Sequence, residues 1–142
     1  MANAINVTSK LSATFSAEVF TNTLTTLNTV PETTSTKGAH IAQTVGTARE
    51  AVLIGDVDIT NATGNDYWLQ LRNVDATNYV TVEMQYGAAT YLQIGMMRPG
   101  GSWGPNLLPK LDGSGYNGIF LDADTADCLV VGVAAEAGDP AA

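Results

Sequence analysis

The chain has 142 residues, of which 45% are hydrophobic and only 14% are charged, and its formal net charge is −8. This length predicts one domain with a single core, and the acidic balance excludes binding to nucleic-acid phosphates as a main function because like charges repel. A single cysteine excludes an internal disulfide, and no apolar run approaches the roughly 20 residues of a membrane span. The charge fraction is low against about 25% in ordinary soluble domains, which leaves surface that partner subunits could cover.

The N-terminal residues 1–20 predict one long strand. Apolar residues occupy most odd positions and polar residues most even positions, and this period of two gives a strand one apolar and one wet face. The alternation is longer than the usual strand of about 5–6 residues. We therefore expect a bent edge strand or an arm that pairs with a neighbouring chain. The first ten residues lack the basic and apolar regions of a secretory signal, so we expect synthesis in a cytoplasm.

Residues 21–38 are rich in threonine and weakly patterned, and Pro31 removes a backbone donor. They predict a surface connector, with room for a short strand near 24–30. The chain thus divides into an N-terminal strand or arm with a Thr-rich connector, residues 1–38, and a β-sandwich core, residues 39–142, within one structural domain overall. The expected interface residues are the apolar residues of the N-terminal part together with one later tryptophan: Val7, Leu11, Phe15, Leu24, Leu27 and Trp103.

The strongest pattern runs from Ala51 to Met97 and predicts four short strands joined by tight turns. The first of them begins near Val52 and ends at Ile59, and a short strand over 41–45 precedes it. In the second, apolar residues at 67, 69 and 71 alternate with Gln70 and Arg72, as expected for a half-buried strand. Turn-forming residues separate the strands at 63–66, 73–78 and 87–89.

The C-terminal part continues the series of short strands. A Pro-Gly-Gly turn at 99–101 precedes an edge-like strand over 106–108, and two further strands are expected over 118–121 and 127–135, followed by a frayed tail over 136–142. About eight short strands at even spacing predict an all-β fold, either an antiparallel β-sandwich or a jelly-roll-like barrel.

The sequence has one carboxylate cluster, formed by Asp122, Asp124 and Asp127. Calcium prefers several oxygen ligands, but this segment lacks the glycine and the closing glutamate of an EF-hand, so a polar turn between two strands is the better interpretation. Asp56 and Asp58 could add ligands if they share one face of a strand and the fold brings them near.

Other chemistry finds little support in the sequence. The lone His40 has no second imidazole, the glycine-rich segment at 100–104 opens no helix, and Cys128 lies in an apolar run as a small buried hydrophobe. We therefore expect no catalytic residue, no metal ligand and no cofactor, and we do not expect an enzyme.

Aromatic residues offer one alternative function, because their faces stack on sugars. A carbohydrate-binding module would use two tryptophans and five tyrosines: Trp68, Trp103, Tyr67, Tyr79, Tyr86, Tyr91 and Tyr116. Aromatic residues are also ordinary core and interface anchors, which is the reading we favour.

A sequence of turns and strands over about residues 52–135 resembles a known class of proteins. Its parts are Asn73-Val74-Asp75-Ala76-Thr77-Asn78-Tyr79-Val80-Thr81-Val82-Glu83, then Arg98-Pro99-Gly100, then Leu121-Asp122-Ala123-Asp124-Thr125-Ala126-Asp127 before an apolar last strand. This order is similar to small β-sandwich virion proteins of tailed bacteriophages, many of which are head decoration (cement), neck or tail components.

The resemblance implies a non-enzymatic virion structural protein, first of all a capsid decoration protein on the outside of the head. Its expected partners are the major capsid protein and further copies of itself, as a trimer because capsids offer three-fold sites, and no nucleic acid or membrane. A tail, neck or fibre-associated structural protein is the alternative within this class.

Overall fold

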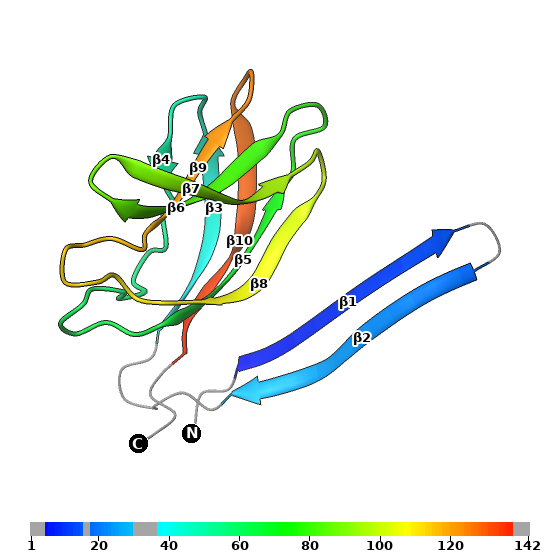
Figure 1. Ribbon diagram of the computed structural model, residues 1–142, viewed down its shortest axis with the longest axis horizontal. Coiled ribbons are helices and arrows are strands. Elements are labelled where there is room, and N and C mark those ends of the chain that lie inside the picture. The colour runs from blue at the N-terminus through cyan, green and yellow to red at the C-terminus, as the bar shows by residue number, and fades with distance from the viewer. Residues whose placement is uncertain (1–4, 16–17, 30–36, 138–142) are drawn as a thin grey trace.

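The computed structural model describes residues 5–15, 18–29 and 37–137, and within them it is built of strands without a helix (Figure 1). Eight strands form two antiparallel sheets, which confirms the predicted all-β sandwich. They are β3 (Gly38–Val45), β4 (Glu50–Ala51), β5 (Tyr67–Asn73), β6 (Val80–Gly87), β7 (Thr90–Met97), β8 (Ser102–Leu108), β9 (Ile119–Ala123) and β10 (Cys128–Glu136). No helix able to cross a membrane occurs in these ranges.

The order of the strands is that of a jelly roll. The first sheet has the order β3-β10-β5-β8 and the second has the order β4-β9-β6-β7. The chain passes back and forth between the two sheets, so that most neighbours within a sheet are distant in sequence; the β6–β7 hairpin is the exception. Eight antiparallel strands in two facing sheets with these crossovers are the double-sheet jelly-roll arrangement.

The core lies between the two sheets and follows from the alternation in the sequence. In β5 the side chains of Tyr67, Leu69 and Leu71 are buried, whereas Gln70 and Arg72 are exposed. The second sheet contributes buried residues in the same way, among them Val80, Val82, Met97 and Leu121. Cys128 is buried at the start of β10, as predicted.

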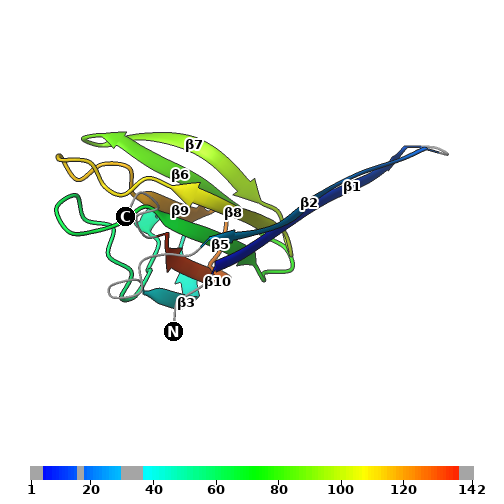
Figure 2. The ribbon, with the colours of Figure 1, turned by 90° about the horizontal axis from the view of Figure 1, so that it is seen from below.

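The N-terminal part differs from the predicted single strand. It forms an antiparallel hairpin of β1 (Ile5–Phe15) and β2 (Glu18–Thr29), in which Ile5 is paired with Thr29 and Phe15 with Glu18. In both views the hairpin reaches well beyond the sandwich (Figures 1 and 2). The Thr-rich segment is therefore a strand as far as Thr29, because threonine suits a pleated strand, and the rest of the predicted connector before Lys37 lies outside the described residues.

Two other expectations were wrong. Residues 52–59 form no strand, because only Glu50 and Ala51 pair with β9 and the chain then turns away into a loop. Gly55 has a φ of 59° in this loop, a conformation that suits glycine. At the other end, Glu136 is not part of a frayed tail but is the buried last residue of β10.

A glycine in β10 gives a test of the sheet packing. A Cβ atom at Gly132 would collide with the backbone carbonyl of Gln70 on β5, and a backbone cannot move aside cheaply. We expect Gly132→Ala to lower the free energy of unfolding by about 2 kcal/mol or more, measured by urea denaturation. Gly38→Ala is the matched control, since its Cβ would lie at an ordinary 3.4 Å from the Ala134 carbonyl and should leave stability nearly unchanged. Equal effects of the two changes would contradict the packing described.

Candidate functional site

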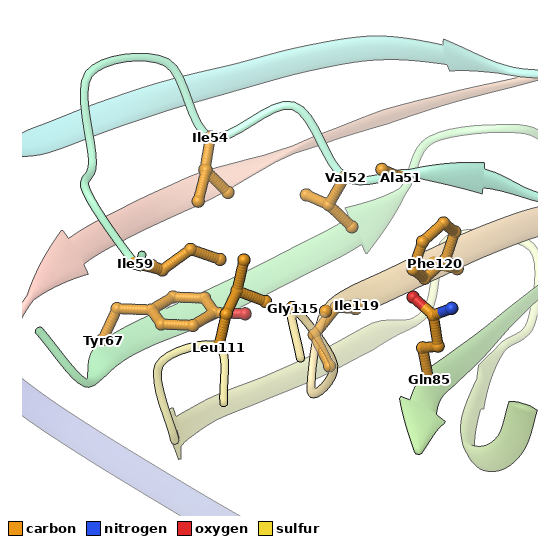
Figure 3. Close-up of a pocket in the computed structure, with 11 residues that line it drawn as sticks. Ala51, Val52, Ile54, Ile59, Tyr67, Gln85, Leu111, Gly115, Ile119 and Phe120 are labelled. Atoms are coloured by element: carbon orange, nitrogen blue, oxygen red, sulfur yellow. The ribbon is translucent and has the colours of Figure 1, made fainter. Parts of the chain in front are cut away.

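A pocket of about 180 Å³ opens between the sheets at one end of the sandwich (Figure 3). It is lined by apolar side chains from β4, β5, β9 and two loops, with one amide and one phenol: Ala51, Val52, Ile54, Ile59, Tyr67, Gln85, Leu111, Gly115, Gly118, Ile119 and Phe120. None of these lining residues carries a charge. Ligand pockets usually hold about 300 Å³ or more, and an apolar cavity of about 150 Å³ holds one benzene. The pocket therefore fits one small uncharged group.

A buried carboxylate fixes the loop that forms one wall of this pocket. The Glu136 side chain accepts hydrogen bonds from the backbone N–H of Asp58 at 2.8 Å and from that of Lys37 at 3.0 Å. The Leu111 N–H donates to the Ile59 carbonyl at 2.8 Å and joins the two loops. A carboxylate that satisfies buried backbone donors holds a loop firmly, so the wall is preorganised.

Tyr67 supplies the main polar atom of the pocket. Its ring lies beside Ile59 and Leu111, and burial raises the pKa of its hydroxyl well above the ordinary value (Figure 3). The hydroxyl therefore stays protonated at physiological pH and can donate a hydrogen bond but cannot act as a base. The lining residues of the pocket include no nucleophile beside a base.

A second cluster lies on the outer face of the second sheet. The guanidinium of Arg49 donates to one oxygen of Glu83 from Nε at 3.0 Å and from Nη2 at 2.8 Å, and its Cζ lies 3.8 Å from the centroid of the Tyr91 ring. Phe120 meets the Tyr91 ring edge to face at 5.1 Å. Glu83 is buried although it faces outward, because the arginine and the aromatic rings cover it. This arrangement stabilises a buried carboxylate by an ion pair and a cation–π contact.

Asp122 completes this cluster. Burial raises its pKa, a hydrogen bond with Glu83 and the negative charge of Glu83 raise it further, and Arg49 opposes these effects. Its Oδ1 is shielded from water and has no partner among the described residues. Asp122 therefore lies near the carboxyl group of Glu83, and one arginine, Arg49, is the only positive charge acting on both acids within this cluster.

The predicted carboxylate cluster is a polar turn between β9 and β10. Asp122 faces Glu83, whereas Asp124 accepts from the Tyr79 N–H and caps its own turn, so the three aspartates serve separate contacts. Asp58 lies in a loop, not on a strand, and bonds to Thr60 and Thr63, which lower its pKa. Across the described ranges, no three His, Cys, Asp or Glu side chains are placed to hold a metal ion.

The aromatic residues considered for sugar binding lie apart. Tyr67 is in the core, Tyr91 is stacked with Arg49, and Trp103 packs so closely on Gly95 of β7 that a Cβ there would collide with its ring. Trp68 has its indole nitrogen shielded from water without an acceptor among the described residues, and Tyr86 is exposed on β6. These aromatic residues do not form one platform.

Of the predicted interface residues, five lie on the hairpin and Trp103 lies on β8, half-buried between the two sheets. Val7 is paired with Leu27 across the hairpin, Ser9 with Leu24 and Leu11 with Asn22. Sequence reasoning missed a second apolar surface, on the outside of β10. Its signal was the almost unbroken apolar run 128–135, because a strand with apolar residues on both faces is typical of burial on both faces.

Comparison of the chain with protein-family models, with curated proteins and with solved structures found no match.

Removing the charge of Asp122 tests the cluster. The folded state raises the pKa of Asp122, so its ionised form costs stability at neutral pH, and we expect Asp122→Asn to raise the Tm by a few degrees at pH 7. As the pH falls through the raised pKa toward the ordinary value near 4, Asp122 takes up its proton and the gain should disappear. The matched control is Asp127→Asn, which removes the same charge from an exposed position. A gain that is independent of pH, or equal in both variants, would contradict the assignment.

Glu136→Ala tests the support of the pocket wall. It leaves the backbone N–H groups of Asp58 and Lys37 without an acceptor, and each buried unsatisfied donor costs about 1–3 kcal/mol. We expect a loss of about 2–4 kcal/mol in urea denaturation and faster amide exchange over residues 52–66. Asp56→Ala, an exposed carboxylate in the same loop, should change neither measurement. Unchanged exchange in Glu136→Ala would show that other contacts hold the loop.

Proposed function

We propose that this chain is a non-enzymatic virion structural protein of a tailed bacteriophage, a capsid decoration (cement) protein that binds between subunits of the major capsid protein. The observation that carries the proposal is a long antiparallel hairpin that projects from a closed jelly-roll sandwich (Figure 1). The turn and strand order that resembles small phage virion proteins supports the same role.

The hairpin is long enough, and has enough free backbone edge, to bind another protein. Its strands of 11 and 12 residues span about 36–40 Å at about 3.3 Å per residue. It forms a two-stranded sheet, so each strand has one edge whose backbone groups are free to pair with a strand of another protein. A specific interface needs about 1,000 Å² or more, and an arm of this length can supply it without any change in the sandwich.

The remaining properties suit the outside of a shell. The net charge of −8 is unfavourable beside packaged DNA and acceptable on the outer surface. Many copies on a symmetric lattice gain from multivalency, so each single contact can be weak. The sugar-binding alternative is less well supported, because the aromatic side chains lie on different faces.

Binding to capsids tests the proposal. Purified protein should co-sediment with capsids of the phage that encodes it when these have been stripped of accessory proteins, and an electron-microscopy map should place it on the outer wall. Deletion of residues 1–29 should weaken this binding at least tenfold while the Tm of the sandwich changes by only a few degrees, because β1 and β2 pair with each other and not with the sandwich.

Isolated tails and necks serve as the parallel sample. Binding to these and not to capsids would favour the tail or neck alternative. Binding to neither, or a capsid affinity that is unchanged by the deletion, would refute the proposed role of the hairpin. Binding to a glycan array that is lost in Trp68→Ala would favour a carbohydrate-binding module instead.

A further inference from the structure

The outer face of the first sheet carries an apolar surface, and several of its side chains are exposed. On β10, Leu129 and Val133 are 45% and 46% exposed, and the half-buried Val131 lies between them on the same face. On β8, at the far edge of the sheet, Leu107 is 52% exposed, and it is paired with Trp68 of β5. We call this surface the β10 face: Trp68, Leu107, Leu129, Val131, Val133 and Ala135.

The position of β10 makes this exposure costly. It is a central strand, paired with β3 on one side and β5 on the other, so its outer side chains lie in the middle of a sheet and not at a rim. Its outward neighbours carry no formal charge apart from Arg72; they are His40, Ala42 and Thr44 on β3 and Gln70 on β5, and His40 is paired directly with Val133. A contiguous apolar patch with few charges on a soluble domain is typical of a docking surface.

The hairpin is the segment of this chain that fits the β10 face. Its register pairs Val7 with Leu27 and Ala13 with Phe20, so most apolar positions of the two strands fall on one side of the ladder. Val19, paired with Thr14, is the exception, and Glu18 pairs with Phe15 on the apolar side. In the 23 residues of β1 and β2 the sequence contains only two charged residues, Lys10 and Glu18. An isolated two-stranded hairpin is marginal in water and needs a surface to pack on.

The same chain does not offer its own β10 face to its own hairpin. The paired strands of the hairpin extend away from the sandwich in both views, and β1 comes close to the first sheet at its edge strand β8 (Figures 1 and 2). At about 36–40 Å it is long enough to cover the nine residues of β10, which span about 30 Å. A second copy would supply the missing surface for each hairpin and the missing cover for each β10 face.

We infer that the β1–β2 hairpin of one copy packs with its apolar face on the β10 face of a second copy, so that the chain assembles with itself by exchanging arms. This inference concerns self-association and goes beyond the proposed binding to capsids. The two can hold or fail separately.

The test uses the full chain and one substitution on each sheet. The wild type should sediment as an oligomer, and Val133→Lys should sediment at the mass of one chain, 14.8 kDa, or need at least tenfold higher concentration to associate. Leu92→Lys is the matched control, because Leu92 is 59% exposed on β7 of the second sheet, and it should associate as the wild type does. Circular dichroism and the Tm verify that both variants fold.

A photo-crosslinker at position 11 of β1 identifies the contact. In a refolded mixture of ¹⁴N- and ¹⁵N-labelled protein, crosslinked peptides should join β1 of one label to β10 or β5 of the other. A monomeric wild type, an oligomer that is unaffected by Val133→Lys, or crosslinks within single chains only would overturn the inference. A wild type that remains monomeric and crosslinks to the major capsid protein instead would overturn it as well, while leaving the capsid role intact.

Discussion

The packing of the inner face of β10 against the rest of the core is the constraint on which the molecule depends. β10 joins β3 to β5 within the first sheet, and its buried Val130 and Ala134 face the second sheet. Its last residue, Glu136, holds the loop that forms a wall of the pocket. The core, one sheet and the pocket therefore share a single strand. Because Gly132 allows β5 to approach so closely, one methyl group added at this position would collide with the β5 backbone and disturb the packing of the sheet.

The strands with a clear period of two were predictable from sequence, and those whose role is set by tertiary contacts were not. β5 and β6 alternate because one face of each meets the core and the other faces outward. Val52 and Val57 are equally apolar, but they are buried from a loop. The Val52 N–H still bonds to the Ile119 carbonyl of β9, whereas the Val57 N–H bonds within the loop to Ile54, and composition alone cannot distinguish this segment from a strand. The second strand of the hairpin, Glu18–Thr29, was predicted only in part, as a short strand near 24–30, because its threonines suit a loop and a strand alike.

The candidate sites were also beyond prediction from local sequence patterns, because their residues come from different parts of the chain. Three aspartates close in sequence were considered as calcium ligands, but a polar turn was the favoured interpretation, and the structure places Asp122 and Asp124 in separate contacts. The cluster that does form joins Arg49, Glu83 and Asp122, which are far apart in the sequence and meet only because β6 and β9 are adjacent in the second sheet. The pocket is likewise assembled from two loops and both sheets. No local sequence pattern predicts the Arg49–Glu83–Asp122 cluster or the pocket.

The jelly-roll crossovers also set the timescale on which this chain can fold. Pairing β10 with β3, and β9 with β4, closes loops that contain most of the sandwich, and all-β domains with such non-local contacts fold in about milliseconds to seconds. A hairpin needs only neighbouring residues and closes in about 1–10 μs. The strands of the arm can therefore pair and separate many times before the sandwich that carries them has closed. Under the arm exchange inferred above, the arm of a new chain can reach an older, already folded copy before its own sandwich has closed, so slow closure of the sandwich would favour contacts between molecules.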